Sequence, residues 1–295
     1  MDINYSAITG SAIYVKSKKL LDTSGRQKSK FIIMFILGLF IFSGIMFLVS
    51  IVAPLTIPVL VVSVFIAFFV FVYKSLIRGS REWSSLQTAL SEFAKQNSFV
   101  YEKTPFMRVG GENIPDTALT LPFKFRLMTN KGNMKGEFQN LPFEYTCGNI
   151  ELVDYRGLSA KSSKRESRSL SAFYITLPIS LPKLYVDAKY NNIVGFEAGT
   201  GAIEEVQKYS LESIFPKFYR VYAQKDDQIN VLSILTPEVM EKLLYNKHLD
   251  VWIDGNKLVV FALNGPFEYF AGIPVVFPMV QMLLNEIDAI AKISR

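Results

Sequence analysis

The chain has 295 residues, a formal net charge of +6 and 50% hydrophobic residues. Its single cysteine, Cys147, excludes an internal disulfide and suits a reducing compartment, and its single histidine, His248, excludes a zinc site built from several histidines. This length allows one or two domains with a hydrophobic core.

The N-terminal quarter of the chain has two parts of opposite character. Residues 1–30 are rich in serine and lysine without a sustained hydrophobic period, so we expect a basic, loosely ordered segment. Residues 31–73 contain no charged side chain, and Pro54 and Pro58 divide them into two apolar halves of about 20 residues, each long enough to cross a bilayer. We predict a two-helix transmembrane hairpin over residues 31–78. A cleaved signal peptide is the alternative, but it would be followed directly by a soluble chain.

Basic residues precede and follow this hairpin. Six lie among residues 1–30 and three among residues 74–81, whereas the connection between the two halves has none. By the positive-inside rule both termini face the cytoplasm, so we predict a multi-pass protein of a bacterial-type plasma (inner) membrane. The basic residues expected at the membrane interface are Lys28, Lys30, Lys74, Arg78 and Arg81.

The positive charge of the chain belongs to these flanks. They carry +4 and +3, which leaves residues 82–295 with a net charge of −1. A domain that binds a nucleic-acid backbone needs a basic face of its own, so we expect no nucleic acid among the partners. The expected partners are membrane lipid and either a protein or a second copy of the chain.

The part of the chain after the hairpin is predicted to be a helix followed by an α+β domain. Apolar residues at steps of three, four and three from Trp83 to Phe93 predict an amphipathic connecting helix over residues 79–98. From residue 99, short β-branched and aromatic runs bounded by Gly, Pro and Asn are typical of antiparallel strands, and helical patterns join them later. The predicted fold class is therefore α+β, an N-terminal transmembrane helical hairpin followed by a cytosolic, mostly antiparallel β domain with packed helices over residues 99–295. That domain can be subdivided near residues 195–210.

Three local signals in the C-terminal part are specific. Thr236 and Pro237 predict a helix start, because Thr caps a helix well and Pro fits its first turn. The runs DVWI and KLVVFAL predict a hairpin across Asp254, Gly255 and Asn256. Residues 278–293 show a helical period, with Pro278 expected near the first position.

A basic segment between two predicted strands is a candidate contact for an anion or a lipid headgroup. It holds four cations, Lys161, Lys164, Arg165 and Arg168. Four cations on a flexible loop attract anions without a designed site, and a long polar hairpin loop explains the same residues. Both interpretations stay open.

The sequence offers few candidates for chemistry. Asp226 and Asp227 suit a polar turn before the helix, since no patterned set of further metal ligands accompanies them. Cys147 lies in a predicted strand without a local base, and His248 is interpreted as a helix-end residue. We therefore assign no catalytic residue, no metal ligand and no cofactor.

The C-terminal third resembles a known family. The segments LESIFPKFYRVYAQKDDQ, ILTPEVMEKLL and DVWIDGNKLVVFA are similar in order to a family of bacterial two-span membrane proteins known only as a domain of unknown function. The resemblance extends over most of residues 31–265, and it implies an architecture without implying an activity.

The predicted function is a membrane-anchored, noncatalytic binding or scaffolding module in the cytosol. One alternative is an enzyme at the membrane surface, which requires that several of Asp226, Asp227, His248, Arg220 and Cys147 meet in one pocket. The other alternative is an accessory subunit of a transport or secretion complex.

Overall fold

The structure is a computed structural model of the chain. It describes residues 3–9, 70, 73–74, 84–85, 87–102, 121–123, 125–152, 166–191, 206–209, 214–224, 227–263 and 272–293. The chain divides into two compact units, one made of Met1–Gly10 with Ala89–Arg295 and the other of Ser11–Thr88. The sheet and the helices packed on it belong to the first unit.

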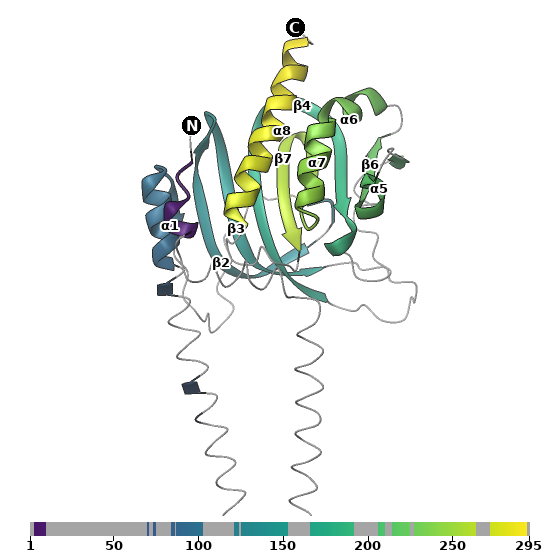
Figure 1. Ribbon diagram of the computed structural model, residues 1–295. Coiled ribbons are helices and arrows are strands. Elements are labelled where there is room, and N and C mark those ends of the chain that lie inside the picture. Colours follow the sequence, from purple (N-terminus) through teal and green to yellow (C-terminus); the bar gives the residue numbers. More distant parts are fainter. Residues whose placement is uncertain are drawn as a thin grey trace, which may run out of the picture. The chain divides into compact units, whose positions relative to one another are not determined.

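The first unit is a mostly antiparallel sheet with helices packed on one face (Figure 1). The strands in the described residues are β1 (Val100–Glu102), β2 (Phe125–Phe138), β3 (Leu141–Leu152), β4 (Glu166–Ala188), β5 (Val206–Tyr209), β6 (Tyr219–Gln224) and β7 (Asp250–Leu263). The helices are α1 (Ser6–Thr9), the 3-10 turn η1 (Lys189–Asn191), α5 (Phe215–Phe218), α6 (Gln228–Ile234), α7 (Pro237–Tyr245) and α8 (Ile273–Ile293). A further helix covers residues 87–96.

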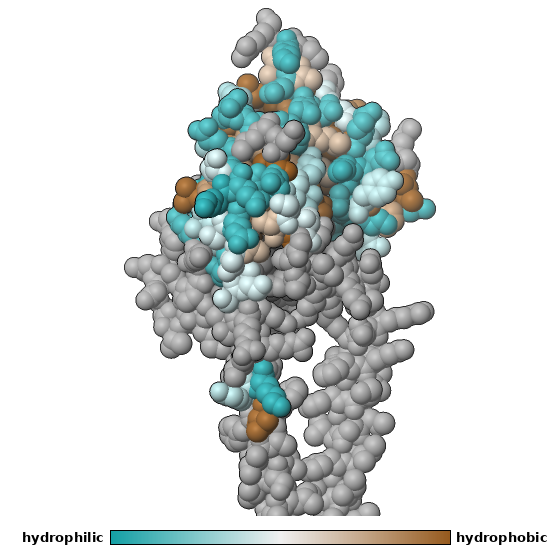
Figure 2. Space-filling view, turned by 60° about the vertical axis from the view of Figure 1, so that its left-hand side comes forward, coloured by the Kyte–Doolittle hydropathy of each residue, from teal (hydrophilic) through white to brown (hydrophobic). Residues whose placement is uncertain are grey.

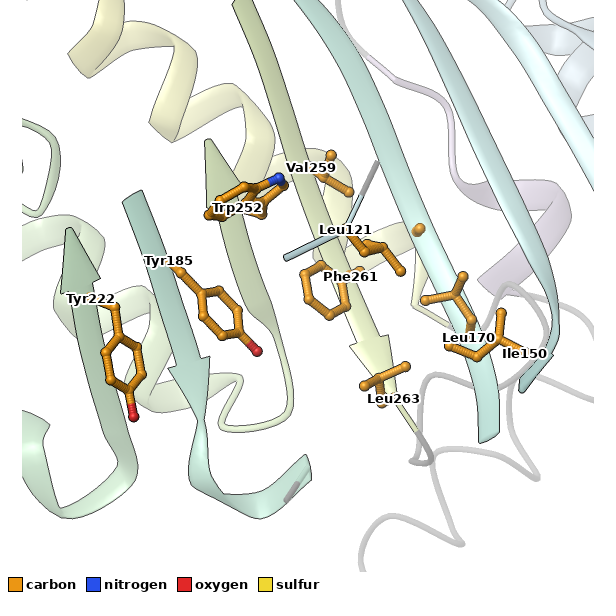
Figure 3. Close-up of a cluster of buried hydrophobic side chains, with 10 residues drawn as sticks. Leu121, Ile150, Leu170, Tyr185, Tyr222, Trp252, Val259, Phe261 and Leu263 are labelled. Carbon is orange, nitrogen blue, oxygen red and sulfur yellow. The ribbon is translucent and has the colours of Figure 1, made fainter. Parts of the chain in front are cut away.

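Strand β7 lies in the middle of the sheet, between two runs of β4. Every strand pair is antiparallel, in the order β1-β2-β3-β4-β6-β5, with β7 paired to β4. Figure 3 shows Trp252 and Phe261 of β7 on adjacent runs between Tyr185 and Leu170 of β4. Both long strands therefore reverse direction midway, and β4 passes around the tip of β7, where Leu181 pairs with Gly255.

The tip of β7 is the predicted hairpin turn. Gly255 has a φ of +61°, a left-handed conformation that glycine adopts without a steric penalty. A glycine at the first central position with a positive φ is typical of a two-residue hairpin loop. The prediction of a turn at Asp254–Asn256 is confirmed.

The helix-covered face of the sheet holds an aromatic core. Phe277 of α8 packs edge-on against Phe173 of β4 and Phe143 of β3, with ring centroids 4.9 and 5.5 Å apart. Phe93 of the helix over 87–96 contacts the same ring at 6.1 Å. Burying such rings contributes about 1.5–3 kcal/mol each, so α8 is held mainly by this face.

The opposite face of the sheet carries a second buried row. Because side chains alternate along a strand, directly paired residues share a face. The row crosses β6, β4, β7 and β3 through Tyr222, Tyr185, Trp252, Phe261, Leu170 and Ile150 (Figure 3). Its left part in that view is aromatic, with the parallel rings of Tyr185 and Tyr222 6.1 Å apart.

The N-terminal residues contact the helix over 87–96 and the residue that follows it through hydrogen bonds and ring stacking. The Asn4 N–H donates to Asn97 Oδ1 at 2.8 Å, and Asn97 Nδ2 donates back to the Asn4 carbonyl at 3.1 Å. The Tyr5 ring stacks on Phe93 at 6.1 Å, and burial raises the pKa of Tyr5 to about 12. The start of the first unit, residues 4–9, is thus tied to the point where the chain re-enters that unit.

Two predicted helix starts have different outcomes. Helix α7 begins as predicted, because Thr236 is its N-cap and Thr236 Oγ1 accepts from the Val239 N–H at 3.5 Å. Helix α8 begins five residues before the predicted start, at Ile273, so Pro278 lies inside it. Ile273 and Phe277 are fully buried, and this packing offsets the cost of a proline within a helix.

The structure requires a correction of the predicted fold class and location. Residues 31–69, which contain most of the predicted hairpin, lie outside the described residues. Among the described residues one helix, α8, is long and apolar enough to cross a membrane, and it is C-terminal. The fold class is accordingly corrected from an N-terminal transmembrane hairpin with an attached domain to a dominant antiparallel sheet with packed helices. The predicted multi-pass topology with two spans is withdrawn, because the one candidate span that the described residues contain is α8, and its buried side chains make it a core helix.

We predict that Gly136→Ala destabilises the first unit by about 1–3 kcal/mol, through overpacking of a close contact. A Cβ at Gly136 would lie 2.7 Å from Phe99 Cδ1 and 3.3 Å from Phe143 Cε1. Urea denaturation measures the loss. The same substitution in a Phe99→Ala background should cost much less, and an equal cost in both backgrounds would contradict the packing explanation.

Candidate functional site

A buried ion pair lies at the end of β4. Asp187 of β4 and Arg220 of β6 are directly paired in the register, so their side chains share the face opposite the helices. Arg220 Nη1 lies 3.3 Å from Asp187 Oδ2, and the side chains are 23% and 1% exposed. The guanidinium therefore neutralises a carboxylate that is almost entirely removed from water.

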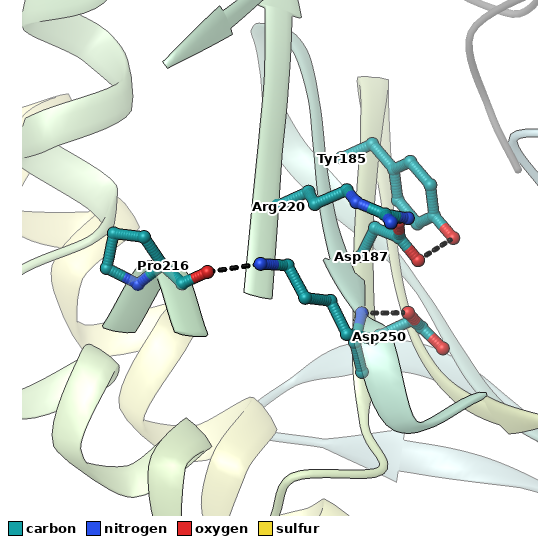
Figure 4. A network of polar contacts seen from close by, with 7 residues as sticks. Tyr185, Asp187, Pro216, Arg220 and Asp250 are labelled. Atoms are coloured by element: carbon teal, nitrogen blue, oxygen red, sulfur yellow. Dashed lines mark hydrogen bonds and ion pairs between the residues drawn. The ribbon is translucent and has the colours of Figure 1, made fainter. Parts of the chain in front are cut away.

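A second buried carboxylate fixes the same strand end (Figure 4). Asp250, the first residue of β7, accepts a 2.7 Å hydrogen bond from the Ala188 N–H. The Tyr185 hydroxyl donates to Asp187 Oδ1 at 3.4 Å. Burial, and then the negative charges of Asp250 and Asp187, hold the pKa of Tyr185 well above its ordinary value, so this phenol stays protonated and can only donate to a carboxylate.

The chain reaches the surface in the next two residues. Lys189 Nζ donates to the Pro216 carbonyl of α5 (Figure 4). Tyr190 then stacks on Phe218 of α5, with ring centroids 6.0 Å apart and planes 14° apart, and lies 5.4 Å from the His248 ring. Three successive residues, Ala188, Lys189 and Tyr190, thus contact Asp250, α5 and a surface aromatic row.

Cations and a further exposed tyrosine complete this surface. Lys247 Nζ lies 4.0 Å above the centre of the Phe218 ring, a cation–π contact. Tyr190 is 56% exposed and Tyr245, at the end of α7, is 78% exposed. We name the surface the aromatic–cationic patch and define it by Tyr190, Lys217, Phe218, Tyr245, Lys247 and His248.

The end of α7 is held in place beneath the patch. The buried Tyr219 hydroxyl donates to the carbonyls of Leu243 and Asn246, at 2.9 and 3.1 Å. Asn246 Nδ2 donates to the Lys242 carbonyl at 2.9 Å. Carbonyls at a helix C-terminus have no partner within the helix, so these bonds satisfy them and fix Tyr245 and Lys247 relative to β6.

On the face in Figure 2, hydrophobic residues are scattered among hydrophilic ones, as is normal for a protein surface. In the patch, by contrast, two rings and an imidazole contact one another and a cation. Its chemistry suits binding by stacking and by attraction of negative charge.

Those residues predicted for an enzyme that the structure describes do not meet in one pocket. Cys147 is buried on the helix-covered face, where its thiol donates to Ser171 Oγ at 3.4 Å, whereas Arg220 lies on the opposite face. Asp227 is the N-cap residue of α6 without a side-chain cap bond, and Asp226 lies outside the described residues. His248 belongs to the aromatic–cationic patch.

Most of the predicted basic contacts lie outside the described residues, namely Lys161, Lys164, Arg165, Lys28, Lys30, Arg78 and Arg81. Arg168 is not on a loop, because it lies in β4 opposite Ile150 and is 3% exposed. Lys74 is helical and exposed. In the part of the chain that the structure describes, no group of three Asp, Glu, His or Cys side chains is placed to hold a metal ion.

Asp187 and Asp250, the buried carboxylates of this site, were not predicted from the sequence. In LYVDAKY, Asp187 interrupts an apolar run. It lies two residues after Tyr185, so both side chains are on the same face of the strand. An acid at a core position of a strand needs a cation or donor, so this alternation was the available signal. The partner of Asp187 is set by the pairing of β4 with β6, which lies some 30 residues later in the chain. No local sequence pattern reveals that pairing.

Comparisons with known proteins give one solved structure of low similarity. No family model and no curated protein matches the chain. A crystal structure of the mycobacterial trehalose monomycolate transport factor A, TtfA, aligns with 68% of this chain and 95% of its own, at 12% identity and a TM-score of 0.40.

We predict that His248 makes the first unit less stable in mild acid. Burial lowers the pKa of His248 below 6.5, so the unfolded chain binds the proton more readily than the folded one. The contribution is present above the unfolded pKa and is lost as the pH falls below about 6.5. Unfolding free energies of the native chain and His248→Gln, measured from pH 7.5 to 5, should diverge toward acid, and parallel curves would contradict this.

We also predict strong coupling between Asp187 and Arg220. Arg220→Met leaves a buried carboxylate without its cation and should cost about 3 kcal/mol, whereas adding Asp187→Asn should restore part of that loss. A double-mutant cycle in urea measures the coupling. Strictly additive losses would mean that the pair does not stabilise the strand end.

Proposed function

We propose that this chain is a noncatalytic binding module that docks another protein on the aromatic–cationic patch. The observation that carries the proposal is the exposure of Tyr190 and Tyr245 on elements that buried hydrogen bonds hold in place. Large exposed aromatic rings are typical of the residues that dominate protein interfaces. The module then supplies a surface, and the reaction or process belongs to its partner.

Preorganisation supports this role. Tyr190 follows directly on Ala188 and Lys189, both of which make hydrogen bonds to other elements, and its ring already rests on Phe218. A side chain that is ordered before binding loses less conformational entropy when a partner arrives. The patch is therefore suited to binding without a rearrangement of the sheet.

The alternatives predicted from the sequence receive less support. An enzyme built on Cys147 and Arg220 would need both side chains at one site, and they lie on opposite faces of the sheet. A role in transport is what the name of the mycobacterial factor states for that protein. It remains one form that a binding role can take, and our proposal rests on the patch alone.

Site-specific photo-crosslinking in cells tests the proposal. With p-benzoylphenylalanine in place of Tyr245 in the full chain, irradiation should give a discrete adduct with another protein. The matched control carries the same group in place of Leu232, which is 46% exposed on α6, and should not give that adduct. No adduct at position 245, or the same adduct at both positions, would refute docking on the patch.

A further inference from the structure

We infer that the segment docked on the aromatic–cationic patch is an acidic peptide segment with apolar side chains, supplied by a partner protein. This inference rests on the proposed binding function and names the chemistry of its partner. It follows from the charges around the patch, from the way the neighbouring acids are used, and from the exposed rings.

The charged residues of the elements that form the patch are predominantly lysines. They are Lys189 in η1, Lys217 in α5, and Lys242 and Lys247 at the end of α7. Residues 82–295 have a net charge of −1, so four lysines within these short elements are a local concentration of positive charge. Such a concentration attracts negative charge within about 8 Å at physiological salt.

Within the described residues three of these lysines are not used to balance acids, whereas Lys189 Nζ donates to the Pro216 carbonyl. Lys217, Lys242 and Lys247 make no ion pair there, and the ion pairs that occur elsewhere include Lys135 with Glu102 and Lys183 with Asp254. The helix end does not require the lysines as caps, because Tyr219 and Asn246 already donate to its carbonyls. The positive charge of Lys217, Lys242 and Lys247 is therefore directed to solvent or to a partner.

Among the described residues, the acids near the patch do not cancel this charge at the surface. Asp187 and Asp250 are each 1% exposed and are engaged by Arg220 and by the Ala188 N–H. Of the two exposed acids of α7, Glu241 lies one helical turn before Tyr245, whereas Glu238 lies in the first turn, at the other end of the helix. Among the described side chains on α5 and at this end of α7, Lys217, Lys242 and Lys247 stand against Glu241, which leaves the patch positive.

The rings define the second property of the partner. Tyr190 and Tyr245 are 56% and 78% exposed, and Ile214, next to the patch at the start of α5, is 49% exposed. They offer apolar area on the elements that carry the lysines. A purely anionic ligand would leave these side chains in water. A segment that places apolar residues on the rings and carboxylates beside the lysines satisfies both.

Fluorescence anisotropy with labelled peptides tests the inference on the full chain. The probes are a short peptide of Glu-Glu-Phe repeats, its Lys-Lys-Phe counterpart and its Glu-Glu-Ser counterpart. The Glu-Glu-Phe peptide should bind at least about tenfold more tightly than either, because it alone matches charge and apolar area. Lys217→Glu combined with Lys247→Glu should weaken it about tenfold.

The control variant is Lys95→Glu, an exposed lysine on the helix over 87–96 that should leave binding within about twofold. Circular dichroism melts show that each variant is folded. Equal binding of the acidic and basic probes, no binding of any probe, or equal weakening by Lys95→Glu would overturn the inference. So would displacement of the peptide by phosphatidylglycerol vesicles at lower concentration than by unlabelled peptide, which would indicate a lipid surface. Crosslinking at position 245 together with these negative results would leave the binding function standing without its acidic partner.

Discussion

The buried carboxylates of Asp187 and Asp250 are the constraint on which the rest of the site depends. They lie at the end of β4 and the start of β7, each 1% exposed, and they are tolerated there because Arg220 and the Ala188 N–H engage them. A charge held in a low-dielectric interior permits few geometries, since loss of its partner is costly. The end of β4 is therefore fixed, and with it the point at which the chain enters the aromatic–cationic patch.

The same long strand connects the core and the surface. One run of β4 pairs with β3 and the other with β6, while β7 pairs with both, so the strand carries Phe173 into the helix-covered core and Tyr185 into the opposite row. Its last residue bonds to Asp250, and Tyr190 follows two residues later. Side chains at the end of a central strand are held in place by the hydrogen bonds of the sheet. A surface built from them is ordered before a partner binds.

Local features were predictable from the sequence, and features that depend on distant pairing were not. The start of α7 at Thr236 and the turn at Gly255 follow from residues next to each other, and both predictions are confirmed. The passage of β4 around β7, the burial of Arg168 and the Asp187 ion pair depend on partners far along the chain. The hairpin prediction relied on composition alone, and in the described residues the apolar helix that could span a membrane is α8. Hydropathy does not distinguish such a core helix from a span.

Hydrogen exchange of the full chain with and without Asp250→Ala tests the central claim most directly. If the buried carboxylate fixes the strand end, residues 188–191 and 214–218 should lose protection while β2 and β3 keep theirs, because the sheet pairs independently of this bond. Unchanged protection in residues 188–191, or an equal loss throughout the sheet, would contradict the account.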